Sequence, residues 1–167
     1  MTSNIHRLLL SGCCFFEGLV LSYKNYTCLV VEDNLSTLTM LVNMLANIGY
    51  RNVITARNGK EAWGKIQTSE TKVDIVLSDM LMPEEDGLQL LQRIRNSEEF
   101  WLLPFIMITC VDDMDRIMSV TEEHIDAYLV KPVTEAVVRQ KNILRPQKYL
   151  RSRPIPSRPV QGEKTSA

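Results

Sequence analysis

The sequence predicts an α/β domain in which helices cover both faces of a doubly wound, five-stranded parallel sheet. Between residues 26 and 144, five short apolar runs alternate with five segments in which apolar residues recur at helical spacing. The runs are apolar at consecutive positions, which is typical of parallel strands that are buried on both sides. Because crossover connections are right-handed, the strand order 2-1-3-4-5 is expected for a sheet of this size.

The first strand is predicted over residues 26–31, and Asn34 can cap the helix after it. Gly49 can end that helix, because glycine readily adopts the left-handed conformation found at many helix ends. Between these two residues, apolar side chains fall on one helical face: Leu38, Leu41, Val42, Leu45 and Ile48.

The second strand is predicted over residues 52–56. A turn at Asn58 and Gly59 then leads into a short helix over residues 61–67. The third strand is predicted over residues 73–78, a mainly apolar run that an aspartate follows directly.

The next helix is expected to follow Gly87, with Leu88, Leu91 and Ile94 on its apolar face. The fourth strand follows Pro104 and covers residues 105–109.

Residues 112–123 are expected to be helical, and the fifth strand covers residues 127–130. Thr134 can cap a last helix that extends to about Leu144. These elements complete the βα alternation of the domain.

Composition places the chain among ordinary globular proteins, with 45% hydrophobic and 23% charged residues. We expect residues 1–24 to be a poorly ordered extension, 25–145 the folded domain, and 146–167 a flexible, proline-rich tail. Residues 145–167 carry a net charge of +5, within a chain whose net charge is only −1. We interpret this tail as a solvated linker, and nothing in the overall charge favours a nucleic acid or an anionic membrane as a partner.

Cysteine usage favours a reducing, cytoplasmic setting. The four cysteines form no C-x-x-C pair, and we expect Cys28 and Cys110 to be buried thiols because both lie in apolar runs. The apolar stretch before Cys13 has only three residues, too few for the hydrophobic region of a signal peptide. No run approaches the length of a membrane span.

Polar residues follow the predicted strands where a doubly wound sheet carries its functional site, at the carboxyl ends of the strands. Glu32 and Asp33 follow the first strand, Asp79 the third, and Lys131 the fifth, while Thr109 ends the fourth. Crowded carboxylates repel one another unless a cation neutralises them, and oxygen ligands suit Mg²⁺. Because lysine and threonine can bind anionic oxygens, the set predicts phosphoryl-transfer chemistry.

Four motifs occur in order and at fitting separations: VEDN at 31–34, LSDMLMP at 77–83 with Gly87, IT at 108–109 and YLVKP at 128–132. In these motifs the sequence resembles the response-regulator receiver family of two-component signalling. The resemblance covers about residues 26–144 and implies the flavodoxin-like receiver fold. GYRNV at 49–53 and LP at 103–104 are similar to the chemotaxis-type single-domain receivers.

The resemblance implies a role for each acidic residue. Asp79 would take a phosphoryl group from a histidine kinase or a histidine phosphotransfer protein. Asp33, Asp79 and the backbone carbonyl of Leu81 would bind Mg²⁺ directly, and Glu32 would bind it through water. The chain would then be a signalling protein, whose only catalysis is its own phosphorylation and slow autodephosphorylation.

It also implies the parts of a switch. Lys131 would pair with a phosphoryl oxygen, and the bond from Lys131 to Pro132 would be cis. Thr109 would move to bind the phosphoryl group, and Tyr128 would turn inward to change a face that binds an unknown downstream protein. Such a receiver is expected to be a monomer or a weak dimer.

The sequence departs from the family's pattern at a few positions. Cys110 stands where a small alanine is usual, and His124 where a glycine is common. Leu81 and Val111, two residues beyond Asp79 and Thr109, are apolar and cannot orient a hydrolytic water, which predicts a long-lived phosphoryl group.

Several alternatives stay open. Tyr128 can be a packing residue, and residues 84–86 are expected to form a solvated turn. The chain can be the receiver part of a DNA-binding transcriptional regulator, although the residues after Arg145 are too few for a helix-turn-helix domain. A phosphatase with an aspartyl nucleophile is a further alternative, but such enzymes carry D-x-D after the first strand, where this chain has Glu32, Asp33 and Asn34.

Overall fold

The computed structural model describes residues 25–68, 72–110 and 125–141, together with Tyr23, Glu70, Leu144, Pro146 and Tyr149. The predicted helix over residues 112–123 lies outside the described residues, as do Val111, His124 and most of the two terminal segments.

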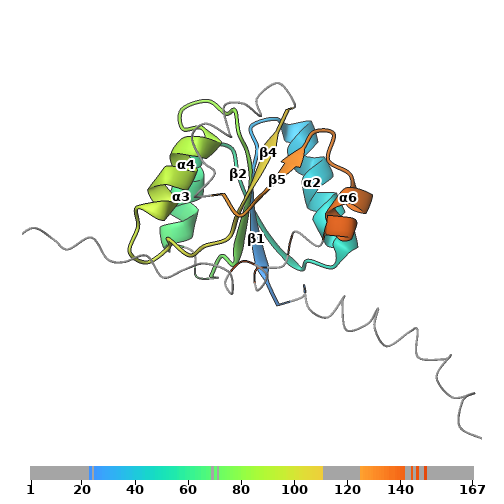
Figure 1. Cartoon of the computed structure of the whole chain (residues 1–167), viewed down its shortest axis with the longest axis horizontal. Coiled ribbons are helices and arrows are strands. Elements are labelled where there is room, and N and C mark those ends of the chain that lie inside the picture. Colours follow the sequence, from blue (N-terminus) through green and yellow to red (C-terminus); the bar gives the residue numbers. More distant parts are fainter. Residues whose placement is uncertain are drawn as a thin grey trace, which may run out of the picture.

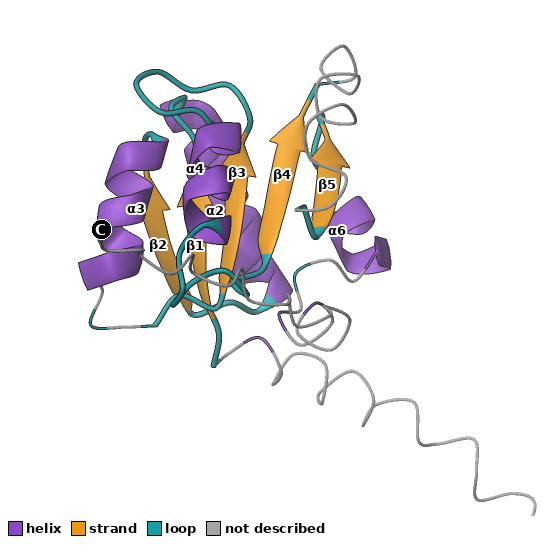
Figure 2. Cartoon of the chain, turned by 60° about the vertical axis from the view of Figure 1, so that its left-hand side comes forward, coloured by secondary structure: helices purple, strands orange, loops and turns teal. Residues whose placement is uncertain are grey.

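Within the described residues, a parallel sheet has five strands in the order β2-β1-β3-β4-β5, which confirms the predicted fold (Figures 1 and 2). The strands are β1 (Thr27–Val31), β2 (Asn52–Ala56), β3 (Ile75–Asp79), β4 (Phe105–Thr109) and β5 (Ala127–Val130). Their carboxyl ends lie at one edge, because Val31 is in register with both Ala56 and Ser78. Thr109 is likewise in register with Val130.

Helices α2 (Leu35–Ile48) and α6 (Glu135–Lys141) cover one face of the sheet, and α3 (Gly59–Thr68) and α4 (Gly87–Arg95) cover the other (Figure 1). Consecutive residues of β1 alternate between the two hydrophobic cores. Cys28 and Val30 pack in the core beneath α2, whereas Leu29 and Val31 pack in the core beneath α3 and α4. Burial on both faces explains why the sequence shows continuous apolar runs.

Two predicted helix ends are confirmed around α2. The Asn34 side chain accepts hydrogen bonds from the amides of Ser36 and Thr37, at 3.0 and 3.1 Å. Gly49 ends the helix with a φ of 116°, in the left-handed region. At α6, the Thr134 hydroxyl accepts from the amide of Val137, so its predicted capping role also holds.

Several element boundaries differ from the prediction by one to three residues. Strand β1 begins at Thr27 and not at residue 26, β3 ends at Asp79 and not at residue 78, α3 ends at Thr68 and not at residue 67, and α6 ends at Lys141 and not near residue 144.

Two further differences have a cause in side-chain contacts. Helix α3 begins at Gly59, before the expected residue 61, because the Asn58 side chain accepts the amide of Glu61 at 2.8 Å and caps the helix earlier. Strand β3 begins at Ile75 and not at residue 73. The reason is Asp74, whose carboxylate accepts the amide of Thr27 at 2.8 Å in place of a backbone carbonyl.

A buried ion pair lies where the sheet begins. Arg95 at the end of α4 donates to the carboxylate of Asp126, 2.9 Å away, and to the carbonyl oxygens of Trp101 and Leu103. Asp126 also accepts the amide of Phe105 at 2.7 Å. The pair therefore connects α4 to the first residues of β4 and β5.

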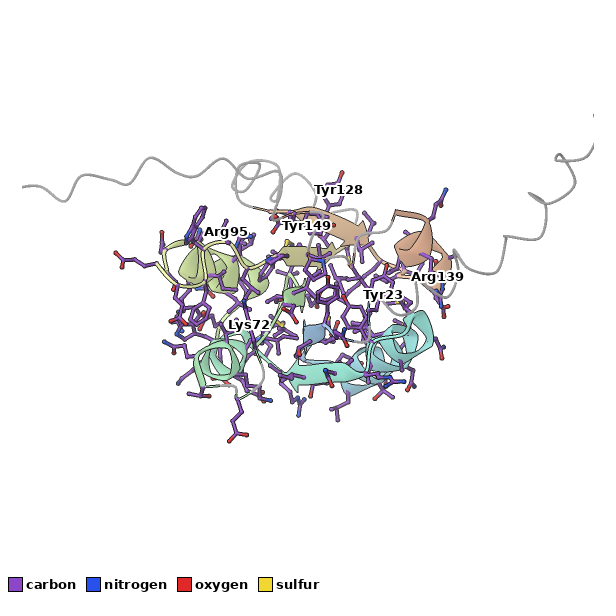
Figure 3. The ribbon with its side chains drawn as sticks, turned by 90° about the horizontal axis from the view of Figure 1, so that it is seen from below. Tyr23, Lys72, Arg95, Tyr128, Arg139 and Tyr149 are labelled. Carbon is purple, nitrogen blue, oxygen red and sulfur yellow. The ribbon has the colours of Figure 1, made fainter. Side chains whose placement is uncertain are left out.

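Aromatic residues close the core between the sheet and α2 at the same end. The rings of Tyr23 and Tyr50 lie 5.3 Å apart, and the Tyr50 hydroxyl donates to the carbonyl of Leu144. Tyr149 is buried in the same core. Tyr23 and Tyr149 are labelled in Figure 3, which views the molecule from this end. Of the helices in the described part of the chain, none combines the length and apolar content that crossing a bilayer requires.

Candidate functional site

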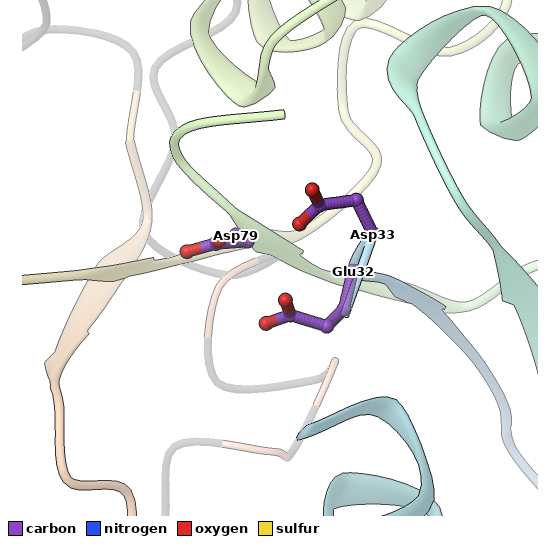
Figure 4. A group of neighbouring side chains, drawn as sticks. All are labelled: Glu32, Asp33 and Asp79. Carbon is purple, nitrogen blue, oxygen red and sulfur yellow. The ribbon is translucent and has the colours of Figure 1, made fainter. Parts of the chain in front are cut away.

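Three carboxylates meet where β1 and β3 end. Glu32 and Asp33 follow β1. Asp79 is the last residue of β3, which pairs with β1. Each offers an oxygen that lies within 4.8 Å of the others. Figure 4 shows the three side chains leaving adjacent strand ends with their carboxylates gathered together. The predicted acidic cluster is thus assembled as the strand order required.

Lys131 joins this cluster from the end of β5. Its Nζ lies 2.9 Å from Oδ1 of Asp79 and 3.4 Å from Oε2 of Glu32. Glu32 and Asp79 are 1% and 7% exposed, so these contacts form in a largely desolvated place. The peptide bond between Lys131 and Pro132 is cis, as predicted.

The pKa values reflect this crowding. Burial raises the pKa of Glu32, and the charge of Asp79 raises it further, despite opposing contacts from the Asn34 amide and from Lys131. Burial alone would lower the pKa of Lys131, but its bonds to Asp79 and Glu32 outweigh burial and raise the pKa. The raised pKa of Lys131 reflects the two carboxylates that its ammonium contacts, whereas that of Glu32 reflects burial first and the charge of Asp79 second.

The donor set fits a hard divalent cation. Among the described residues, one ammonium faces three carboxylates whose oxygens are close together. Asp33 is only half-buried, so the cluster is open to solvent on one side. Carboxylate oxygens with access to water are the environment in which proteins bind Mg²⁺.

The two predicted switch residues lie on neighbouring strands. Thr109 ends β4 and is 1% exposed, and its hydroxyl donates to the carbonyl of Cys110 at 3.1 Å, not to a carboxylate. Tyr128 on β5 is 40% exposed and projects outward from the sheet (Figure 3). The structure thus brings Thr109 to the carboxyl edge and leaves Tyr128 outside the core.

The loop after β3 is fixed closely against the site. The amide of Gly87 donates to the carbonyl of Met80 at 2.9 Å. A Cβ atom at position 87 would lie 2.2 Å from the backbone carbonyl of Asp79, so only glycine fits. Asp86 and Gln89 form a capping box at the start of α4. Leu81, on this loop, is 48% exposed.

One expectation about this edge is wrong, and another holds only in part. Cys110 is exposed, because β4 ends at Thr109 and the next residue leaves the sheet. Residues 84–86 are not simply a solvated turn, since Glu85 is buried. The Glu85 carbonyl accepts a hydrogen bond from the amide of Gly59 at 2.8 Å. Because position 59 is a glycine, there is room beside it for the Glu85 side chain.

The sequence reasoning missed Arg57, which follows β2. Its Nη2 donates to the backbone carbonyl of Asp33 at 3.0 Å. Strand β2 lies beside β1 in the predicted order, so a residue just past its carboxyl end belongs to the same edge. The position of Arg57 directly after the second strand is the sequence feature that predicts its place at this edge.

Comparison with known proteins gives one consistent family. The profile of the response regulator receiver domain matches residues 28–142. The chemotaxis protein CheY1 of Helicobacter pylori is 34% identical over 114 residues, which are 68% of this chain and 90% of that protein.

Solved structures agree with this match. The chemotaxis response regulator CheY4 of Vibrio cholerae superposes with a TM-score of 0.60 at 26% identity, over 70% of this chain and 95% of that one. The receiver domain of the sensor histidine kinase PA1611 from Pseudomonas aeruginosa superposes with a TM-score of 0.62 at 26% identity, over 76% and 98%. That structure holds a magnesium ion coordinated in its active-site cleft.

Proposed function

The chain belongs to the response regulator receiver domain family, and from this premise we propose that Asp79 accepts a phosphoryl group from a histidine kinase or a histidine phosphotransfer protein. Receiver domains of this CheY-like kind act in two-component signalling. The observation that supports the choice of Asp79 is its ion pair with Lys131, at 2.9 Å, inside the acidic cluster.

The proposed transfer is a substitution at phosphorus. An oxygen of the Asp79 carboxylate forms a bond to phosphorus, the bond from phosphorus to the donor histidine nitrogen breaks, and that nitrogen keeps the electron pair. Lys131 binds Oδ1, which favours attack by Oδ2. Its ammonium is then close enough to pair with an oxygen of the transferred group.

We propose that Asp33, Asp79 and the carbonyl of Leu81 hold Mg²⁺ directly, with Glu32 bound through water. When bound, the ion would supply positive charge that offsets the charge of the phosphoryl oxygens. The closeness of the carboxylate oxygens supports this ligand set.

We propose that phosphorylation changes one surface of the domain, and that this change is the output signal. Thr109 would exchange its bond to the Cys110 carbonyl for one to the phosphoryl group, and the exposed ring of Tyr128 would turn inward. A downstream protein would read this surface. We further propose that residues 25–145 form the receiver domain, that it is a monomer or a weak dimer, and that it works in the cytoplasm without binding nucleic acid.

Incubation with Mg²⁺ and a small phosphodonor, followed by intact-mass measurement, tests the central proposal. The wild type is expected to gain the mass of one phosphoryl group, and Asp79→Asn is expected to gain none. Asp86→Asn is a matched control, because asparagine can still cap α4 and the acidic cluster is unchanged. Equal labelling of the wild type and Asp79→Asn would show that another residue is the acceptor.

A further inference from the structure

Arg57 is attached to the edge of the sheet that carries the acidic cluster. The Glu32 amide donates to the carbonyl of Ala56 at 3.0 Å, which places the residue after Ala56 beside the end of β1. From there, Nη2 of Arg57 reaches the Asp33 carbonyl at 3.0 Å. The guanidinium is therefore anchored to the backbone of a residue whose carboxylate belongs to the cluster.

The turn that carries Arg57 is also fixed to the loop after Asp79. The Asn58 amide group donates to the Glu84 carboxylate at 3.1 Å, and the Gly59 amide donates to the Glu85 carbonyl at 2.8 Å. A Cβ atom on Gly59 would lie 2.7 Å from Cγ of Glu85, so this junction has little freedom. The position of Arg57 is consequently set from both sides of the site.

The charge of Arg57 acts on the neighbouring Glu61 only in a minor way, because Lys65 and the Arg57 amide contribute more to the lowered pKa of that carboxylate. Among the described residues Arg57 forms no ion pair, and its guanidinium donates to a neutral carbonyl. Glu61 is the acid closest along the chain, but its carboxylate binds Lys65 at 2.6 Å and the backbone amide of Arg57. Arg57 is exposed, whereas the Lys131 ammonium already binds two carboxylates.

We propose that Arg57 is a specificity-determining residue that favours small dianionic phosphodonors, such as acyl phosphates, over monoanionic ones. Its positive charge is held beside the acidic cluster by the bond to the Asp33 carbonyl, and it attracts an incoming phosphate more strongly when that phosphate carries two negative charges than when it carries one. This inference rests on the proposed phosphorylation of Asp79. In the step that it assists, an Asp79 oxygen bonds to phosphorus, the phosphorus–oxygen bond to the acyl group breaks, and the carboxylate product leaves with the electron pair.

A structural role is the competing explanation, because Arg57 also supports the Asp33 backbone. Two substitutions separate the roles. Arg57→Gln keeps an N–H donor for the carbonyl but removes the charge, and Arg57→Lys keeps the charge but loses the planar fork. Lys72→Gln is the matched control, since it removes an exposed cation three residues before β3 begins, at the opposite end of the sheet.

The experiment measures phosphorylation rates below donor saturation, at saturating Mg²⁺, with acetyl phosphate and carbamoyl phosphate as dianions and phosphoramidate as a monoanion. If the Arg57 charge and the incoming phosphate are on the order of 8 Å apart in water, Arg57→Gln is expected to slow phosphorylation by the dianionic donors about fivefold and by the monoanionic donor about twofold. The difference is expected to vanish at about 0.5 M salt because exposed charges are then screened. Arg57→Lys is expected to recover most of the rate, and Lys72→Gln to change none.

Rates that differ from these expectations would overturn the inference. Equal slowing of all three donors by Arg57→Gln, or a weakened Mg²⁺ affinity that accounts for the slowing, would assign Arg57 a structural role. Unchanged rates would remove any role in donor choice. If the wild type itself gains no phosphoryl group from any donor, the proposed function fails, and that failure is distinct from failure at Arg57.

Discussion

The ammonium of Lys131 lies 2.9 Å from Oδ1 of Asp79, although β4 separates the strands that carry them. Lys131 can cross the end of β4 because its amide bonds to the carbonyl of Thr109, the last residue of that strand, at 2.8 Å. The lysine therefore stabilises the folded acidic cluster as well as serving the proposed chemistry.

Lys131→Gln is expected to lower the metal-free free energy of unfolding by about 1–3 kcal/mol, because Glu32 and Asp79 would stay buried without a cation. Urea unfolding in a chelator measures this change. Added Mg²⁺ is expected to stabilise the variant more than the wild type, since it would replace the lost charge. A midpoint equal to that of Lys72→Gln would contradict this role of Lys131.

Gly87→Ala is expected to destabilise the domain and displace Asp79, because its Cβ would meet the Asp79 carbonyl at 2.2 Å. We expect a loss of about 2–4 kcal/mol in urea unfolding, and slower phosphorylation of the protein that remains folded. Gly64→Ala is the control. Nothing lies within 4 Å of its Cβ position in α3, so alanine is expected to stabilise the helix by about 0.5–1 kcal/mol. Similar effects at both positions would refute the steric argument.

Much of the fold and the acidic cluster followed from the sequence for a simple reason. A parallel sheet brings the carboxyl ends of its strands to one edge, so a residue's position just after an apolar run predicts its place. Asp33, Asp79 and Lys131 were found in this way, and their spacing carried the family resemblance.

What the sequence could not predict depends on side-chain contacts between segments distant in the chain. The start of β3 depends on an Asp74 carboxylate that replaces a backbone acceptor. The burial of Glu85 depends on the absence of a side chain at Gly59. The role proposed for Arg57 depends on the contact between its guanidinium and the Asp33 carbonyl, and no local sequence pattern predicts that contact.

Arg95→Leu is expected to destabilise the protein by about 3–5 kcal/mol, because it leaves the Asp126 carboxylate buried without its cation. Adding Asp126→Asn is expected to restore part of that loss, since the buried charge is then gone. A double-mutant cycle by urea unfolding measures the coupling. Additive effects of the two substitutions would show that there is no coupling free energy between Arg95 and Asp126.

Tyr50→Phe is expected to cost about 1 kcal/mol at neutral pH through loss of the hydrogen bond to the Leu144 carbonyl. It is also expected to reduce alkaline destabilisation. Burial raises the pKa of Tyr50 above its ordinary value of 10.0, so the unfolded chain loses this proton first and stability falls as pH rises beyond about 10. Unfolding free energies measured from pH 8 to 11 test both effects, and an unchanged alkaline slope would argue against a buried hydroxyl.

Leu81→Asn is expected to accelerate loss of the phosphoryl group from Asp79. Leu81 lies two residues beyond the proposed acceptor and is 48% exposed, so an amide there would face solvent and can orient an attacking water. One such hydrogen bond is worth about 1 kcal/mol, which corresponds to about a fivefold faster rate. Leu81→Ala is the control, because it opens access without adding a polar group. Dephosphorylation followed by intact mass separates the two variants: equal rates would mean that water access, and not its orientation, sets the lifetime.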